Sequence, residues 1–329
     1  MAGRAGEAGR AGQARRAGGN LAFRLGTGLF GLILVLIVAA IGLELTRQSW
    51  LSIQKFGLNF WRTEVWDPVA GQFGAYPFIW GTLYSSVLAL LLAAPISLGI
   101  AVFISELSPN RLKPVLVFLT ELLAAIPSII YGLWGMFVLV PAVRAFERSI
   151  PQGMKSLPFF TGPPYGLGML AAALILAVMV IPFTSSVARE VLKAVPVAQR
   201  EGAYALGATR FEAITAALYY ARTGIVGAVM LGFGRALGET MAVTMVIGNN
   251  AKASWSLLAP QHTMAAAVAN EFTEADTALY LSALIEIGLV LFVITLIVNS
   301  LSRLLIWSMA RPVRQQAAAV VVPAAESAA

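Results

Sequence analysis

The sequence predicts an all-α membrane protein with six transmembrane helices. Of its 329 residues, 58% are hydrophobic and only 12% are charged, whereas an ordinary soluble domain carries about 25% charged residues. The hydrophobic residues gather in stretches that match the roughly 20 residues a spanning helix needs. Composition and pattern together exclude a soluble enzyme and a disordered scaffold.

The apolar stretches cover residues 25–43, 78–104, 122–143, 167–188, 223–250 and 277–302. The first is uncharged. It is followed by Glu44 and Arg47 rather than by the small residues of a signal-peptide cleavage site, so we expect it to remain in the protein as a helix. Six spans place both termini on the same side of the membrane.

The basic residues predict which side that is. Of the 23 Lys and Arg residues, 15 fall on the side of the two termini, 7 fall on the opposite side, and Arg235 lies inside a span. Cytoplasmic loops carry the excess of Lys and Arg, so we expect both termini in the cytoplasm. The net charge of +7 then reflects topology, and we expect no nucleic-acid partner.

The spans divide the chain into four segments. Residues 1–20 and 308–329 are expected to be disordered cytoplasmic tails, and the arginines of the first also suit contact with anionic membrane lipid. Residues 21–77 hold the first helix and a long outer loop. Residues 78–307 form a core of five helices that includes the long inner loop 189–222.

Residue counts limit the chemistry of the chain. It has no cysteine and a single histidine, His262, so we expect no metal site. It lacks the phosphate-binding motif G-x-x-x-x-G-K-[ST], so we expect neither ATP hydrolysis by that route nor a bound cofactor. Energy for any transport must come from another protein or from a gradient.

The inner loop 189–222 has the pattern of two helices joined at a glycine. Pro196 suits a helix start and Gly207 a helix stop. Thr209 is a candidate N-cap for a second short helix, with Glu212 three residues on as in a capping box. A short rigid helix here suits docking into a cleft of a soluble partner, and an ordinary amphipathic connector is the alternative.

The fifth stretch carries two ionisable residues deep in the membrane. Arg235 lies about 18 Å along a helix from Thr223, and Glu239 follows four residues later on the same helix face. A membrane charge costs roughly 2.5–3.5 kcal/mol on the insertion scale, so such residues usually face a cavity or a partner. Because a planar guanidinium suits an oxyanion, we expect Arg235 to contact a passing anion and Glu239, paired with it, to moderate the attraction. A purely structural ion pair is the alternative.

Four further polar residues are weaker candidates. Ser128 and Thr240 are able to donate hydrogen bonds to a solute, although such residues more often join helices to one another. Glu121 and Glu286 are acids in or near the membrane, and we expect them either to line the path or to contact a partner subunit.

The inner loop also carries a family motif. Glu201-Gly202-Ala203, with Gly207 six positions after the Glu, resembles the EAA coupling loop of ABC-importer permeases. The resemblance implies the type I ABC importer permease fold. It implies that the residues which couple the chain to an ATPase subunit are Glu201, Gly202, Ala203, Leu206, Gly207 and Ala208. The chain departs from the family in having Gly202 for Ala and Tyr219-Tyr220 for Leu-Pro.

The segment 234–243 resembles the permeases of phosphate-specific ABC importers, as do segments 60–82 and 126–132. The resemblance implies import of inorganic phosphate across the bacterial cytoplasmic membrane by alternating access. It implies three partners: a second permease subunit (PstA-like), an ATPase dimer (PstB-like) that binds ATP and Mg²⁺, and an extracytoplasmic phosphate-binding protein (PstS-like).

Two other functions stay open at this point. Sulfate and molybdate permeases share a related Arg–Gly–Glu pattern, so transport of another oxyanion is the first alternative. The second is an ion-coupled carrier or a membrane anchor for a signalling complex, which would work without an ATPase. The motif from Glu201 to Gly207 argues against this second alternative.

Overall fold

The computed structural model describes residues 2–151, 153–154 and 156–326, and it describes side chains within 23–309. In this part of the chain the regular secondary structure is helical, with two isolated β-bridges, Asp67–Gln72 and Gly248–Gln261. The elements in chain order are α1 (Ala2–Gln48), α2 (Trp50–Phe56), the 3₁₀ helix η1 (Gly57–Trp61), α3 (Tyr76–Val102), the π-helix η2 (Phe103–Leu107), α4 (Lys113–Ala125), α5 (Ser128–Trp134), the π-helix η3 (Gly135–Leu139), α6 (Val140–Ser149), α7 (Met169–Lys193), α8 (Val197–Ala205), α9 (Arg210–Leu237), α10 (Met241–Val246), α11 (Met264–Glu271) and α12 (Ala278–Glu326).

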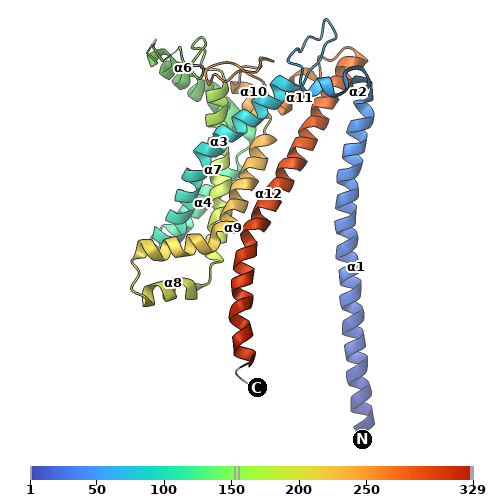
Figure 1. The fold of residues 1–329 in the computed structure, drawn as a ribbon, viewed down its shortest axis with the longest axis vertical. Coiled ribbons are helices and arrows are strands. Elements are labelled where there is room, and N and C mark those ends of the chain that lie inside the picture. The colour runs from blue at the N-terminus through green and yellow to red at the C-terminus, as the bar shows by residue number, and fades with distance from the viewer. Residues whose placement is uncertain (1, 152, 155, 327–329) are drawn as a thin grey trace.

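Six of the described helical segments are long and apolar enough to cross a membrane, which confirms the predicted number of spans. They are Phe23–Gln48, Tyr76–Leu107, Ser128–Ser149, Met169–Lys193, Arg210–Leu237 and Ala278–Met309. Figure 1 shows both ends of the chain and α8 at the lower end of the molecule, and α2, α6 and α11 at the upper end. The inner and outer loops expected from the sequence are therefore separated as predicted.

Two spans differ from the sequence prediction because each contains a break. The third does not run unbroken from residue 122, since α4 ends at Ala125 and α5 begins at Ser128, on either side of Ile126 and Pro127. Proline lacks the amide hydrogen that a helix needs and disfavours helical geometry at the residue before it.

The fifth span also differs from the prediction of one apolar helix over 223–250. It begins earlier, at Arg210, and α9 ends at Leu237. The chain then leaves the helix at Gly238, and the short α10 starts at Met241. The second helix of the inner loop is therefore the start of this long span and not the short separate helix that we expected.

Helix α7 lies at the centre of the bundle. Most of its apolar window is buried, whereas α1 buries none of its window, and the lower part of α1 lies away from the other helices at the right of Figure 1. The main core cluster joins α7 to α3, α5 and α10 through residues that include Ala89, Ile175, Met179 and Val243. The exposed apolar residues of α1 suit contact with lipid tails, as a membrane span requires.

The terminal segments continue two of the spans. The backbone of residues 2–20 belongs to α1 and that of residues 310–326 belongs to α12, and their side chains lie outside the described residues. Alanine, the strongest helix former, is abundant in both segments. Disorder of these tails, expected from their composition, stays a prediction.

Candidate functional site

The two helix breaks meet inside the bundle. Helix α5, which follows the first break, packs directly on α10, which follows the second: a Cβ atom placed on Gly132 would lie 2.7 Å from the sulfur of Met245 and 3.1 Å from the Cα atom of Ala242. Non-helical backbone at membrane depth is tolerated only where protein buries it or where it lines a cavity. The paired breaks thus mark the part of the membrane domain best suited to a solute site.

At the first break, a backbone carbonyl group near the end of α4 accepts a hydrogen bond from a side chain. The hydroxyl group of Tyr131 donates a hydrogen bond of 2.8 Å to the carbonyl oxygen of Leu123, in the last turn of α4. The same carbonyl accepts a longer hydrogen bond, of 3.4 Å, from the backbone amide of Ile126, the C-cap residue of α4. Ser128, which we predicted to face the solute, is half-buried and begins the same short helix as Tyr131.

Arg235 lies at the second break, in the last turn of α9. Its guanidinium carbon is 5.2 Å from the centre of the Phe183 ring on α7. Tyr131 of α5 is close enough to interact electrostatically with the guanidinium. Within the described part of the chain, the guanidinium makes no ion pair and no side-chain hydrogen bond. The carbonyl end of a helix attracts a cation, so the last turn of α9 is an electrostatically favourable position for Arg235. Its hydrogen-bond donors therefore remain free for an anion.

The predicted pair between Arg235 and Glu239 is wrong. Glu239 lies beyond the end of α9, since the helix stops at Leu237 and Gly238 is its C-cap, so the four-residue spacing no longer puts the two side chains on one face. The carboxylate of Glu239 instead accepts a hydrogen bond of 3.4 Å from the backbone amide of Ala242, near the start of α10. Thr240 is half-buried at the same break, and its hydroxyl donates to the carbonyl of Gly238 at 3.3 Å.

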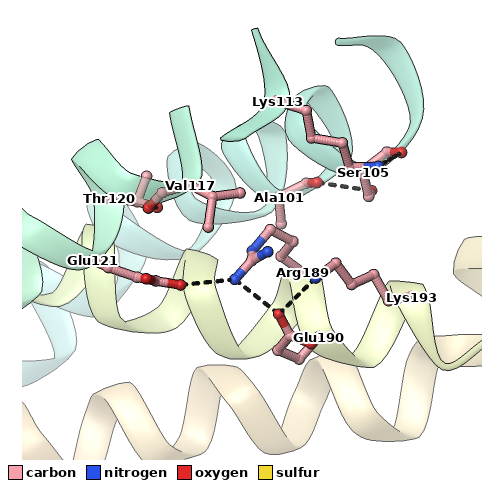
Figure 2. Close-up of polar contacts among 9 residues, drawn as sticks. All are labelled: Ala101, Ser105, Lys113, Val117, Thr120, Glu121, Arg189, Glu190 and Lys193. Carbon is pink, nitrogen blue, oxygen red and sulfur yellow. Dashed lines mark hydrogen bonds and ion pairs between the residues drawn. The ribbon is translucent and has the colours of Figure 1, made fainter. Parts of the chain in front are cut away.

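Glu121 joins α4 to α7 through a buried arginine. As Figure 2 shows, the guanidinium of Arg189 points between two carboxylates, with 3.2 Å to Glu121 and 2.8 Å to Glu190. The side chain of Arg189 is only 5% exposed, whereas that of Glu121 is 57% exposed. A buried cation needs such partners because water does not reach it. Arg189 belongs to α7 and not to the predicted inner loop 189–222, and no local motif distinguishes it.

Glu286 lies away from the two breaks. It is 3% exposed on α12, where it packs beside Ser52 of α2 near the outer end of the bundle. One of its carboxylate oxygens has no hydrogen-bond partner. In this position it is covered by its own chain and offers little surface to another subunit.

The inner loop forms a helix–glycine–helix unit, in which the first helix is the predicted short one and the second is the start of α9. Helix α8 follows Pro196, and Gly207 adopts φ +83°, a left-handed conformation that glycine accepts without strain. Thr209 and Glu212 make the predicted capping box: the Thr209 hydroxyl accepts from the amide of Glu212 at 3.4 Å, and the Glu212 carboxylate accepts from the amide of Thr209 at 2.7 Å.

The loop residues implied in coupling lie at the lower end of the molecule, around α8. Glu201 and Gly202 are exposed, Ala203 and Ala208 are half-buried, and Leu206 is 91% exposed. No side chain in α8 is buried. An exposed leucine beside small residues and a glutamate provides a surface that a soluble partner is able to cover.

Comparison with known proteins identifies the family of the chain. Residues 94–311 match the family described as binding-protein-dependent transport system inner membrane component. The chain is 48% identical over 293 residues to the phosphate transport system permease protein PstC of Haemophilus influenzae, which covers 87% of this chain and 93% of the relative. It is 45% identical over 278 residues to PstC of Mesorhizobium japonicum, covering 83% and 85% of the two chains.

The fold has a counterpart among solved structures. A chain from inward-facing structures of the MetNI methionine ABC transporter superposes with a TM-score of 0.54 at 16% identity, covering 70% of this chain and 93% of that chain. This similarity shows the shared type I ABC importer permease fold. By its sequence and its fold, the chain belongs to the PstC family of binding-protein-dependent inner membrane transport components.

Proposed function

We propose that this chain is the permease subunit of an ATP-driven ABC importer that carries inorganic phosphate across the cytoplasmic membrane. Relatives that share close to half of its residues are named phosphate permeases. The observation that carries the proposal is the position of Arg235, a half-buried cation at the junction of two broken helices whose donors are left free. A planar guanidinium is well suited to bind an oxyanion through two parallel hydrogen bonds.

The residues around Arg235 take complementary roles in this proposal. Ser128 and Thr240 lie at the two breaks and donate hydrogen bonds to phosphate oxygens. Glu239 places a negative charge beyond the break, which keeps the attraction of Arg235 from holding the anion permanently. A transporter must release its cargo, so an isolated cation would be a poor site.

The energy for transport comes from outside this chain. We propose that an ATPase dimer, which binds ATP and Mg²⁺, docks on the α8 surface, and that a PstA-like second permease subunit completes the path. A PstS-like phosphate-binding protein delivers the anion at the opposite face. The excess of Lys and Arg on the side of α8 and both termini supports a cytoplasmic position for that side.

Uptake of labelled phosphate at low external concentration tests this function. The assay compares cells that lack the chain, cells in which the chain is restored and cells that carry Arg235→Ala. Sulfate and molybdate are added as competitors. Arg47→Ala is the matched control, since Arg47 is 82% exposed at the end of α1. We expect uptake only with the intact chain and the control, unaffected by the competitors.

Two results would redirect the proposal. Uptake that sulfate or molybdate blocks would favour the alternative oxyanion permease. Normal phosphate uptake by Arg235→Ala, at normal protein level, would remove Arg235 from the path.

A further inference from the structure

A charged contact joins α8 to the inner end of α3. The glutamate involved is Glu106, which lies in η2, the π-helix that ends the α3 span. Nη2 of Arg200, in the middle of α8, lies 2.6 Å from Oε1 of Glu106. The exposed fractions of the two side chains are 22% for Arg200 and 12% for Glu106, so this ion pair is largely shielded from water. A shielded, charge-assisted hydrogen bond is stronger than an exposed pair.

Arg200 is held in one orientation by two further bonds. Its guanidinium also donates to the carbonyl oxygens of Leu192 at 3.0 Å and Val195 at 3.1 Å, at the end of α7. A single side chain on α8 therefore contacts both α7 and η2. Because no residue of α8 is buried, these polar contacts contribute much of its attachment to the spans.

A second arginine reaches Glu106 from the other side of the loop. Arg210 is the first residue of α9, and its Nη2 donates a hydrogen bond of 2.6 Å to the backbone carbonyl of Glu106. Carbonyl groups in the last turn of a helix lack helical partners and are free to accept. Glu106 thus accepts one bond through its side chain and one through its backbone, from arginines on either side of the coupling residues 201–208.

We propose that Glu106 is a positioning residue that transmits movement of α8 to the membrane helices. When the ATPase displaces α8, Arg200 and Arg210 move the end of α3 with it. Helix α3 packs along both α7 and α9, and α9 carries Arg235 at its far end. The contact therefore connects the ATPase docking surface mechanically to the anion site. This inference rests on the proposed import function.

The test uses the complete complex in proteoliposomes, with the phosphate-binding protein and ATP. The variant is Glu106→Gln, which removes the charge of the side chain and keeps its shape. We measure retention of the ATPase, ATP hydrolysis and phosphate accumulation. We expect the ATPase to stay bound and ATP to be hydrolysed, while phosphate imported per ATP falls about tenfold, within the usual range of coupling between sites. Glu106→Asp, which keeps the charge, should recover most of the loss.

Two additional variants keep the test decisive. Arg200→Gln breaks the same contact from α8 and should lower the ratio similarly, and the double variant should show little extra loss. Arg111→Gln is the matched control: this exposed arginine lies five residues after Glu106 and makes no ion pair with the residues that the structure describes, so the ratio should be unchanged.

The outcomes separate this inference from the function on which it rests. A normal ratio of phosphate to ATP in Glu106→Gln, or loss of the ATPase from that variant, would overturn the positioning role. A wild-type complex that imports no phosphate would overturn the proposed function itself.

Discussion

At the scale of single residues, the chemistry centres on a cation that its own chain leaves unpaired. The arrangement differs from a structural ion pair, in which a neighbouring carboxylate would occupy the guanidinium. Arg235 is instead flanked by an aromatic ring and a phenol, Phe183 and Tyr131, neither of which carries a compensating charge. An anion is the ligand that such surroundings favour.

Replacing Arg235 by lysine separates charge from geometry. Arg235→Lys keeps the positive charge and loses the planar pair of donors, so phosphate uptake should fall by about tenfold to a hundredfold, the value of a charged hydrogen bond. The measurement is the rate of labelled phosphate uptake at normal protein level. Full activity with lysine would mean that charge alone suffices and that bidentate binding plays no part.

The buried His262 should make the folded protein less stable in mild acid. It lies in the outer loop before α11, and burial lowers its pKa to about 4, although the Glu271 carboxylate is 3.8 Å away. The unfolded chain takes up this proton near pH 6.5 while the folded protein does not, so the folded state is penalised as the pH falls from 6.5 towards 4, by about 2 kcal/mol at pH 5. Above pH 6.5 the penalty disappears.

The thermal midpoint of the purified chain at pH 7 and pH 5 checks this prediction. His262→Gln cannot take up a proton, so its midpoint should fall less between the two values than that of the wild type. An equal fall in both proteins would assign the acid sensitivity to other groups.

At the scale of elements, the close packing of α5 on α10 keeps the two breaks together. Gly132→Val inserts atoms where Met245 and Ala242 already lie within contact distance, and overpacking of this kind costs about 1–3 kcal/mol. Separation of the breaks should abolish phosphate uptake while the ATPase stays bound, as measured by co-purification. Gly99→Val is the control, because Gly99 of α3 has open space around it and should tolerate the change. Equal uptake by the two variants would contradict the role of this packing.

We expect the ATPase to bind at the exposed end of α8, where Leu206 is the C-cap residue. Leu206→Asp places a charge on a side chain that is 91% exposed, so the fold should be unaffected while the ATPase no longer co-purifies. Leu58→Asp alters a leucine that is 84% exposed in η1, directly after α2, and should retain the ATPase. Helix α2 lies at the opposite end of the molecule from α8 (Figure 1). Retention by both variants would place the docking surface elsewhere.

Much of this element-level structure follows from local sequence rules. Apolar length predicted the spans, and the Thr209–Glu212 spacing predicted a capping box that the structure contains. The break after Leu237 could not be predicted from length, because apolar residues resume at Met241 and the whole stretch is long enough for one span. The error in pairing Arg235 with Glu239 followed from that. Arg189 and its partner Glu121 are 68 positions apart in the sequence, and Glu106 and its partner Arg200 are 94 positions apart. No local pattern encodes contacts over such distances.

At the scale of the whole molecule, the bundle separates two tasks. The two breaks lie inside the membrane domain, where an anion needs a path, and the α8 surface lies at the lower end, where a soluble partner is able to bind. Helices α3, α7 and α9 pack against one another and connect the two regions. In the function that we propose, the energy for transport enters through α8, the docking surface for the ATPase.

The most direct test of this account is phosphate accumulation in proteoliposomes that contain the chain, its partner permease, the ATPase and the binding protein. We expect accumulation that requires both ATP and the ATPase, and that Arg235→Ala abolishes while ATP hydrolysis continues. Accumulation driven by an ion gradient without the ATPase, or equal accumulation by Arg235→Ala, would contradict it.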